Sequence, residues 1–254
     1  MCSGVPRYED AKHDAASSTL CNTKLMNEPI LINDPRAAAM PIHECGEPLV
    51  DLRTCPLLAT DEHPHVSKRC ETQLYCREGV ARRFLEAERL LPEGVRLLIL
   101  ECHRPIELQR YYWEKDLAAL RERNPDWSEE QLVTENAKLV APPDPTPPHS
   151  TGGAADVTLV DVSGATETEL DMGVPVNTEG PLSHTAAKGI SEEATKNRVV
   201  LLGAMEGAGF INYGYEWWHY SYGDRYWAYV RGESAAIYGV VSVEAPLTED
   251  SGGK

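Results

Sequence analysis

The spacing of apolar residues predicts a helix over residues 73–91. Its apolar face is formed by residues that recur at helical spacing: Val80, Phe84, Ala87 and Leu91. The Pro-Glu-Gly sequence at 92–94 ends this helix in a turn. The mostly apolar run 95–100 that follows has the length of a strand, and we expect it to be buried.

Three more helices are predicted from signals at their ends. Pro105 is a favoured first helical residue, and Ser128 with Gln131 has the spacing of a capping box. Ser191, followed by two glutamates, is another N-cap signal, and Gly209 ends that helix. The expected helices therefore cover residues 105–123, 128–139 and 191–208.

Strands are expected where short apolar or aromatic runs occur. These runs are residues 49–52, 155–160, 210–220 and 225–230, with a turn at 222–224. Residues 163–181 are polar and glycine-rich, which predicts a loop. Because the predicted helices cluster early and the strands late, we expect an α+β fold, with a small, mainly antiparallel sheet flanked by helices.

The ends of the chain differ in pattern from its middle. Residues 1–40 have no clear period and are expected to form an irregular arm, and residues 244–254 are expected to form a flexible acidic tail. Residues 41–243 are expected to fold as a single domain, which a chain of 254 residues is long enough to build.

Charge and apolar content exclude two classes of partner. The formal net charge of −16 argues against nucleic acid, whose binding proteins carry basic surfaces. No apolar run is long enough for a membrane span, and the first residues lack the apolar segment of a secretory signal. We therefore expect a cytoplasmic protein with no membrane partner. No oligomeric state follows from the sequence.

The seven cysteines are irregularly spaced and include no C-x-x-C pair. This pattern predicts reduced thiols rather than a disulfide framework or a cysteine-based zinc site. A Cys70–Cys76 disulfide is the alternative that the spacing leaves open.

Two short strings offer the parts of a catalytic metal site. His149 and Asp156 are separated by six residues that include a Gly-Gly pair, and Glu216 precedes His219 by three. Two imidazoles and a carboxylate match the three protein ligands of a catalytic zinc, and Glu216 is a spare carboxylate that can act as a base. Residues three apart on a regular strand face opposite sides. Glu216 and His219 can therefore meet one metal only where the strand ends, bulges or turns.

One arginine and the remaining histidines complete the candidate chemistry. Arg104 lies between the predicted strand and the helix that follows, where its guanidinium could stabilise an oxyanion. The alternative is an exposed arginine in a salt bridge. Five histidines are expected to be surface residues or hydrogen-bonded core residues: His13, His43, His63, His65 and His103.

Together, the two strings resemble those of the zinc D-alanyl-D-alanine dipeptidases, which include the vancomycin-resistance dipeptidase. This group lies among the D,D-carboxypeptidases and shares a zinc-binding fold with the hedgehog signalling domain. Arg104-Pro105 and the Asp-Met-Gly at 171–173 are similar to further family features. The resemblance extends over residues 48–230 and implies a single zinc peptidase domain.

The resemblance also implies roles for individual residues. His149, Asp156 and His219 would bind one zinc ion per chain, and Glu216 would act as the general base. Arg104 would stabilise the tetrahedral intermediate. The substrate would be D-Ala-D-Ala or a similar small dipeptide, cleaved to free amino acids. The alternatives are a D,D-carboxypeptidase or muropeptide endopeptidase of the same fold, and a zinc-binding module without catalysis.

Two departures from the family pattern concern the substrate. Pro147 stands where the family usually has a serine, and Asn177 stands where an aspartate holds the substrate's ammonium group. Glu179, two residues further on, is a candidate to replace that aspartate. Ser183 and His184 are further candidates for the substrate pocket.

Overall fold

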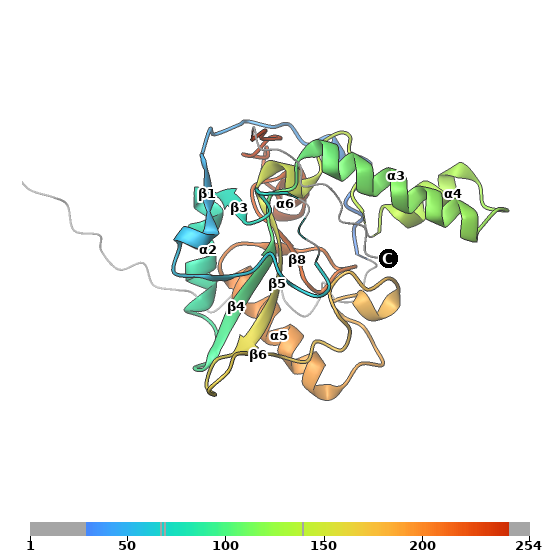
Figure 1. The fold of residues 1–254 in the computed structure, drawn as a ribbon. Helices are drawn as coiled ribbons and strands as arrows, with labels where there is room; N and C mark the ends of the chain where they lie inside the picture. The colour runs from blue at the N-terminus through green and yellow to red at the C-terminus, as the bar shows by residue number, and fades with distance from the viewer. Residues whose placement is uncertain (1–28, 67, 69, 139, 244–254) are drawn as a thin grey trace, which may run out of the picture.

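The computed structural model describes residues 29–66, 68, 70–138 and 140–243. Its centre is a six-stranded sheet with the order β2-β4-β5-β8-β7, in which β6 pairs with β5 (Figure 1). The strands of this sheet are β2 Leu58–Ala59, β4 Val95–Glu101, β5 Ala154–Asp161, β6 Thr168–Glu169, β7 Ile211–Asn212 and β8 His219–Ser221. Only β2 and β4 pair in parallel among these described strands.

A second, two-stranded sheet pairs β1 (Leu49–Asp51) with β3 (Tyr75–Arg77) in antiparallel fashion. Both sheets are small, and helices lie around them (Figure 1). The expected α+β class with a mainly antiparallel sheet is confirmed. Among the described residues, no helix combines the length and the apolar character that crossing a bilayer requires.

The helices form three groups around the main sheet. Helices α2 (Glu78–Glu88) and α5 (Glu192–Gly207) pack against each other and contact β4 and β5 respectively. Helices α3 (Ile106–Arg123) and α4 (Glu129–Asn136) pack together and project from the body of the protein (Figure 1). The short α1 (Pro35–Ala38) packs on α6 (Arg225–Arg231).

The main core lies between the sheet and the α2–α5 pair. The rings of Phe84 and Phe210 stack there with their centroids 5.2 Å apart. Trp217 and Trp218 are each 1% exposed and anchor the turn that leads into β8. The two tryptophans of the second string therefore hold the backbone of that string in place.

Several expectations about elements are confirmed. The strands expected at 49–52, 95–100 and 155–160 correspond to β1, β4 and β5. Ser128 and Gln131 form a complete capping box at the start of α4, although that helix ends at Asn136, before the expected residue 139. The Ser191 hydroxyl accepts a hydrogen bond from the N–H of Ala194 and caps α5.

Three expectations are wrong in type or extent. The helix expected from residue 73 begins only at Glu78, because residues 75–77 pair with β1. The strand expected over 210–220 is interrupted by a turn between β7 and β8. Residues 225–230 form helix α6, because the side chain of Asp224 accepts the N–H of Trp227 and caps a helix there.

The described part of the expected arm is not wholly irregular. Residues 35–38 form α1, and the guanidinium of Arg225 donates to the carbonyl of Ala38 at 2.8 Å. Apolar residues of this segment pack against the aromatic cluster around α6: Ile30, Leu31, Ile32 and Met40. Residues 1–28 and the expected tail at 244–254 lie outside the described residues.

Two smaller expectations concern the loop at 163–181 and the cysteines. The loop is confirmed except for the two residues of β6 and for Pro181, which begins a short 3-10 helix. All five described cysteines are free thiols, so the Cys70–Cys76 disulfide is not formed: Cys45, Cys55, Cys70, Cys76 and Cys102.

Candidate metal centre

His149 follows a proline-rich segment and lies in a short 3-10 helix, Pro148–Thr151. Gly152 ends this turn with φ of 70°, a left-handed conformation that glycine adopts without strain. A side chain at Gly153 would collide with the carbonyl of Tyr222, so the second glycine permits a close approach of two backbone segments. Nδ1 of His149 lies 2.7 Å from the carbonyl oxygen of Cys102. A carbonyl can only accept, so Nδ1 carries the proton and Nε2 keeps a free lone pair.

Asp156 and His219 lie side by side on the central strands. Asp156 of β5 pairs directly with His219, the first residue of β8. Asp156 also pairs with Glu101 at the end of β4, where the register shifts. Three polar residues thus form one row across three strands at the place where His149 enters.

The donor atoms of His149, Asp156 and His219 form a tight triangle. Nε2 of His149 lies 3.1 Å from Nδ1 of His219 and 3.4 Å from Oδ1 of Asp156, and the remaining side is 3.1 Å. Tetrahedral zinc with ligands at about 2.0–2.1 Å separates its donor atoms by about 3.3–3.4 Å. The three buried donors therefore fit one zinc ion, with the fourth position left for water.

The protonation of these groups also suits a metal. Burial alone would raise the pKa of Asp156, but the neighbouring His149 and His219 hold that pKa well below its usual range. Burial lowers the pKa of His219, because the charged imidazolium is poorly solvated there. A charged carboxylate and a neutral imidazole are the forms that bind zinc.

Glu216 lies in the turn between β7 and β8, as the spacing required. Its N–H donates to the carbonyl of Tyr213, and the N–H of His219 donates to the carbonyl of Glu216. The turn brings Oε2 of Glu216 to 3.7 Å from Nδ1 of His219. Burial, and then the charge of Asp156, raise the pKa of Glu216 well above its ordinary value.

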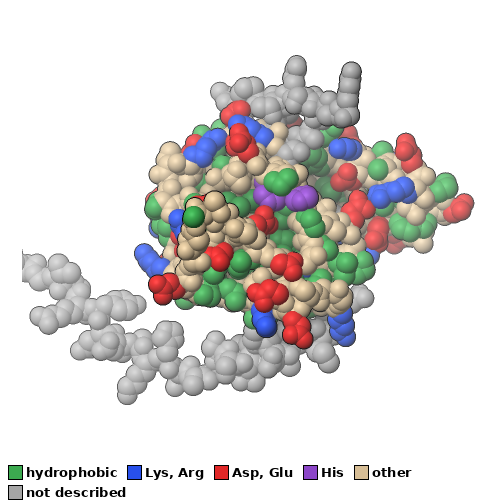
Figure 2. All heavy atoms as spheres, turned by 60° about the horizontal axis from the view of Figure 1, so that its bottom comes forward, with side chains coloured by type: hydrophobic (Ala, Val, Ile, Leu, Met, Phe, Trp, Pro, Cys, Tyr) green, Lys and Arg blue, Asp and Glu red, His purple; other side chains and the backbone are tan. Residues whose placement is uncertain are grey.

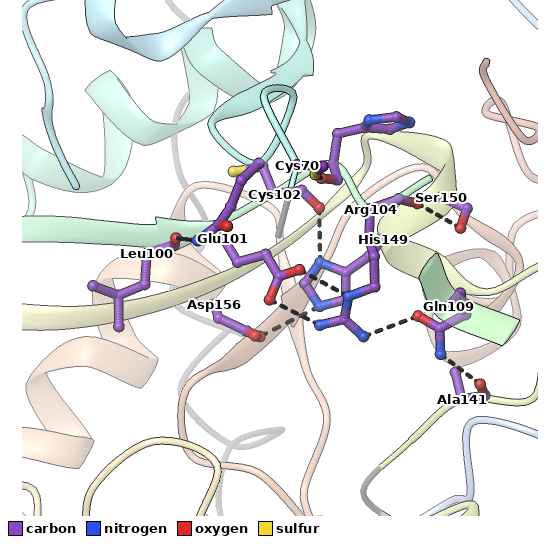
Figure 3. Close-up of polar contacts among 12 residues, drawn as sticks. Cys70, Leu100, Glu101, Cys102, Arg104, Gln109, Ala141, His149, Ser150 and Asp156 are labelled. Carbon is purple, nitrogen blue, oxygen red and sulfur yellow. Dashed lines mark hydrogen bonds and ion pairs between the residues drawn. The ribbon is translucent and has the colours of Figure 1, made fainter. Parts of the chain in front are cut away.

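Arg104 follows β4 and faces the same cavity. It is in a salt bridge, but the bridge is mostly buried, with 13% of the Arg104 side chain and 9% of the Glu101 side chain exposed. Figure 3 shows its guanidinium between Glu101 and Gln109, close to His149 and Asp156. Figure 2 shows one face of the protein, on which Asp and Glu side chains lie at several places.

A cavity of about 410 Å³, which includes space open to solvent, connects the metal centre with Glu216 and Arg104. Its wall is formed by residues from segments that lie far apart in the sequence: Ile32, Arg104, Gln109, Ala137, Ala141, Pro148, His149, Asp156, Asn177, Tyr213, Glu216, Trp218 and His219.

Of the four expected substrate-binding residues, Asn177 lines this cavity and the other three do not. Glu179 is exposed and pairs with Arg123 at 3.2 Å. Ser183 is buried, and its hydroxyl bonds to the carbonyls of Gly180 and Tyr215. The ring of His184 packs edge-on against Tyr215.

Sequence reasoning missed four residues that build this site: Ile32, Glu101, Gln109 and Tyr213. Glu101 lies three residues before Arg104 and Gln109 five residues after it. This closeness in the sequence was the signal that could have indicated their contact with Arg104. Ile32 has no such signal, because it reaches the cavity from the N-terminal segment through tertiary packing alone.

Comparison with known proteins gives one family and several relatives. The family model Peptidase_M15, described as D-ala-D-ala dipeptidase, matches residues 73–234. The D-alanyl-D-alanine dipeptidase of Synechocystis sp. is 28% identical over 228 residues, covering 75% of this chain and 88% of that protein. The Escherichia coli D-alanyl-D-alanine dipeptidase is 29% identical over 127 residues, covering 50% of this chain and 55% of that protein.

Solved structures with detectable similarity are more distant. The structure of the LdcB LD-carboxypeptidase has a TM-score of 0.41 and 17% identity, covering 76% of this chain and 77% of that chain. VanYB in complex with D-alanine-D-alanine has a TM-score of 0.38 and 18% identity, covering 70% of this chain and 92% of that chain.

Proposed function

The chain belongs to the D-Ala-D-Ala dipeptidase family of zinc metallopeptidases, and we propose on this premise that it hydrolyses D-Ala-D-Ala, or a similar small dipeptide, to free amino acids. The observation that carries the proposal is the convergence of three buried donors, His149, Asp156 and His219, beside Glu216 in one small cavity. These donors would hold one zinc ion per chain.

Each residue has a distinct task in this reaction. Zinc, when bound, acidifies a water molecule and polarises the scissile carbonyl. Glu216 takes a proton from the attacking water and passes it to the leaving amine, so that the C–N bond breaks and two amino acids form. Arg104 donates hydrogen bonds to the oxyanion that develops on the carbonyl.

The amino end of the substrate is held by a neutral group in this proposal. Asn177 lines the cavity, and its side-chain nitrogen donates to the carbonyl of His65 at 2.8 Å. The amide oxygen of Asn177 is then the acceptor for the substrate's ammonium. A neutral acceptor tolerates variation at the amino end better than a carboxylate does, because it forms no ion pair.

The alternatives differ in the size of substrate that they require. A D,D-carboxypeptidase or muropeptide endopeptidase must admit a longer peptide, so the length of the peptide that is cleaved distinguishes these alternatives from a dipeptidase. A zinc-binding module without catalysis needs neither Glu216 nor Arg104 in the cavity wall. The cytoplasmic location, the absence of a nucleic-acid partner and the domain limits at 41 and 243 stay predictions.

A panel of dipeptides tests the substrate class. We expect release of amino acid from D-Ala-D-Ala and D-Ala-D-Ser, and at least about tenfold lower kcat/KM for N-acetyl-D-Ala-D-Ala, because acetylation removes a charged donor. The measurement is free amino acid released per unit time, with L-Ala-L-Ala as the control for stereochemistry. Faster cleavage of the acetylated peptide, or of a pentapeptide ending in D-Ala-D-Ala, would favour the carboxypeptidase instead.

A further inference from the structure

Arg104 is held from two sides by side chains that no metal-site motif includes. Its Nε and Nη2 donate to the two oxygens of Glu101 at 2.8 and 2.9 Å, and its Nη1 donates to Gln109 at 2.9 Å (Figure 3). The guanidinium carbon also lies 5.0 Å from the ring centroid of Tyr112. These contacts leave the guanidinium plane little freedom to rotate.

A register shift in the sheet places Glu101 in this position. Ile99 pairs with Val157, but the next pair along joins Glu101, rather than Leu100, to Asp156. The extra residue in β4 is a bulge, which re-aims the following side chain. Without it, Leu100 would lie opposite Asp156 and Glu101 would point to the other face of the sheet. The bulge therefore sets the carboxylate of Glu101 on the cavity side.

Gln109 is fixed in turn by a second contact. Its side-chain nitrogen donates to the carbonyl of Ala141 at 2.6 Å, and the residue is only 1% exposed. Because a carbonyl accepts only, the amide nitrogen of Gln109 must face Ala141 and its amide oxygen must face Arg104. The orientation of Arg104 is thus tied to the proline-rich segment that leads into His149.

We infer that Glu101 is a positioning residue, which together with Gln109 aims Arg104 at the reacting carbonyl. A guanidinium has five N–H donors, and the described contacts occupy three of them. One donor on each terminal nitrogen remains to interact with an oxyanion. Glu101 also offsets the charge of Arg104, so the pair offers directed hydrogen bonds rather than a free cation. This inference rests on the proposed function.

The test compares two glutamates that hold arginines in the same way. Glu88 accepts from Nε and Nη2 of Arg96, both at 3.0 Å, and Arg96 also lies on β4 but outside the cavity wall. We expect Glu101→Gln to lower kcat for D-Ala-D-Ala about 100-fold, with KM changed less than about threefold. The reason is that a wrongly oriented Arg104 guanidinium stabilises the transition state less, while substrate binding in the ground state is nearly unchanged. Glu88→Gln should leave both constants at wild-type values.

A phosphinate isostere of the dipeptide separates positioning from a merely structural role. Its tetrahedral oxygens imitate the transition state, so its affinity should fall by the same factor as kcat/KM in Glu101→Gln and stay unchanged in Glu88→Gln. If Glu101→Gln does not fold, Gln109→Met removes the other partner of Arg104 without unpairing a charge, and we expect about tenfold losses in both measurements.

The outcomes distinguish the inference from the proposed function. An active wild-type protein whose Glu101→Gln variant keeps wild-type kcat and phosphinate affinity overturns the inference alone. A loss of kcat without a loss of phosphinate affinity also overturns it, because the effect would not pass through the oxyanion. A wild-type protein that neither cleaves D-Ala-D-Ala nor binds the phosphinate refutes the proposed function, and the inference with it.

Discussion

Replacement of Glu216 by glutamine is expected to lower kcat for dipeptide hydrolysis about a thousandfold while zinc stays bound, since a general base contributes roughly 10²–10⁴ in rate. Glutamine keeps the size of the side chain in a buried turn but cannot accept a proton. The donor atoms of His149, Asp156 and His219 are unchanged by the substitution. The measurements are kcat on D-Ala-D-Ala and the zinc content of the purified variant.

Glu193→Gln is a suitable control for this experiment. Glu193 is exposed in the first turn of α5 and does not line the cavity. The Glu193→Gln variant should keep wild-type turnover and zinc content. If Glu216→Gln also turned over at the wild-type rate, Glu216 would have no part in the proton transfers, and another base would have to be sought in the cavity.

Removal of zinc by a chelator is expected to abolish hydrolysis and to lower the unfolding temperature by about 10 °C. An ion present at a thousand times its Kd stabilises the native state by about 4 kcal/mol, and each kcal/mol shifts Tm by about 2–4 °C in a chain of this size. Addition of one zinc per chain should restore both activity and Tm.

Two variants identify the ligands in this experiment. His149→Ala should bind no stoichiometric zinc, and its Tm should no longer respond to the chelator. Cys45→Ser removes an exposed free thiol and should keep both the zinc and the response. Loss of zinc from the cysteine variant, with retention by His149→Ala, would place the metal elsewhere in the chain.

The three residues that we propose as zinc ligands could be predicted from the sequence because their spacing is local. His149 and Asp156 flank the turn that contains Gly152 and Gly153, and Glu216 and His219 lie in a second turn. The relative position of each pair therefore depends on a few backbone angles. The meeting of the two pairs then requires only that β5 and β8 be neighbours. The chemistry of the side chains also limited the kinds of site that they could form, since few sites need two imidazoles and two carboxylates together.

Other parts of the fold could not be derived in this way. Aromatic residues at 225–230 favoured a strand, but the Asp224 cap and the left-handed Gly232 enclose a helix. The side chain of Glu101 reaches Arg104 only because β4 carries a bulge, and the residue pattern of that strand does not predict a bulge. Ile32 reaches the cavity because α1 packs on α6, which is a contact between distant parts of the chain.

The position of Ile32 in the cavity wall means that the shape of the substrate space and the catalytic groups come from different parts of the chain. All the groups assigned to the chemistry lie within residues 73–234, the stretch that matches the family model, whereas Ile32 lies before it. An exchange of residues 29–40 would therefore reshape the space around the substrate without touching a ligand or a proton carrier. Variation in this segment would then change which substrates fit, while the groups assigned to the reaction stay in place.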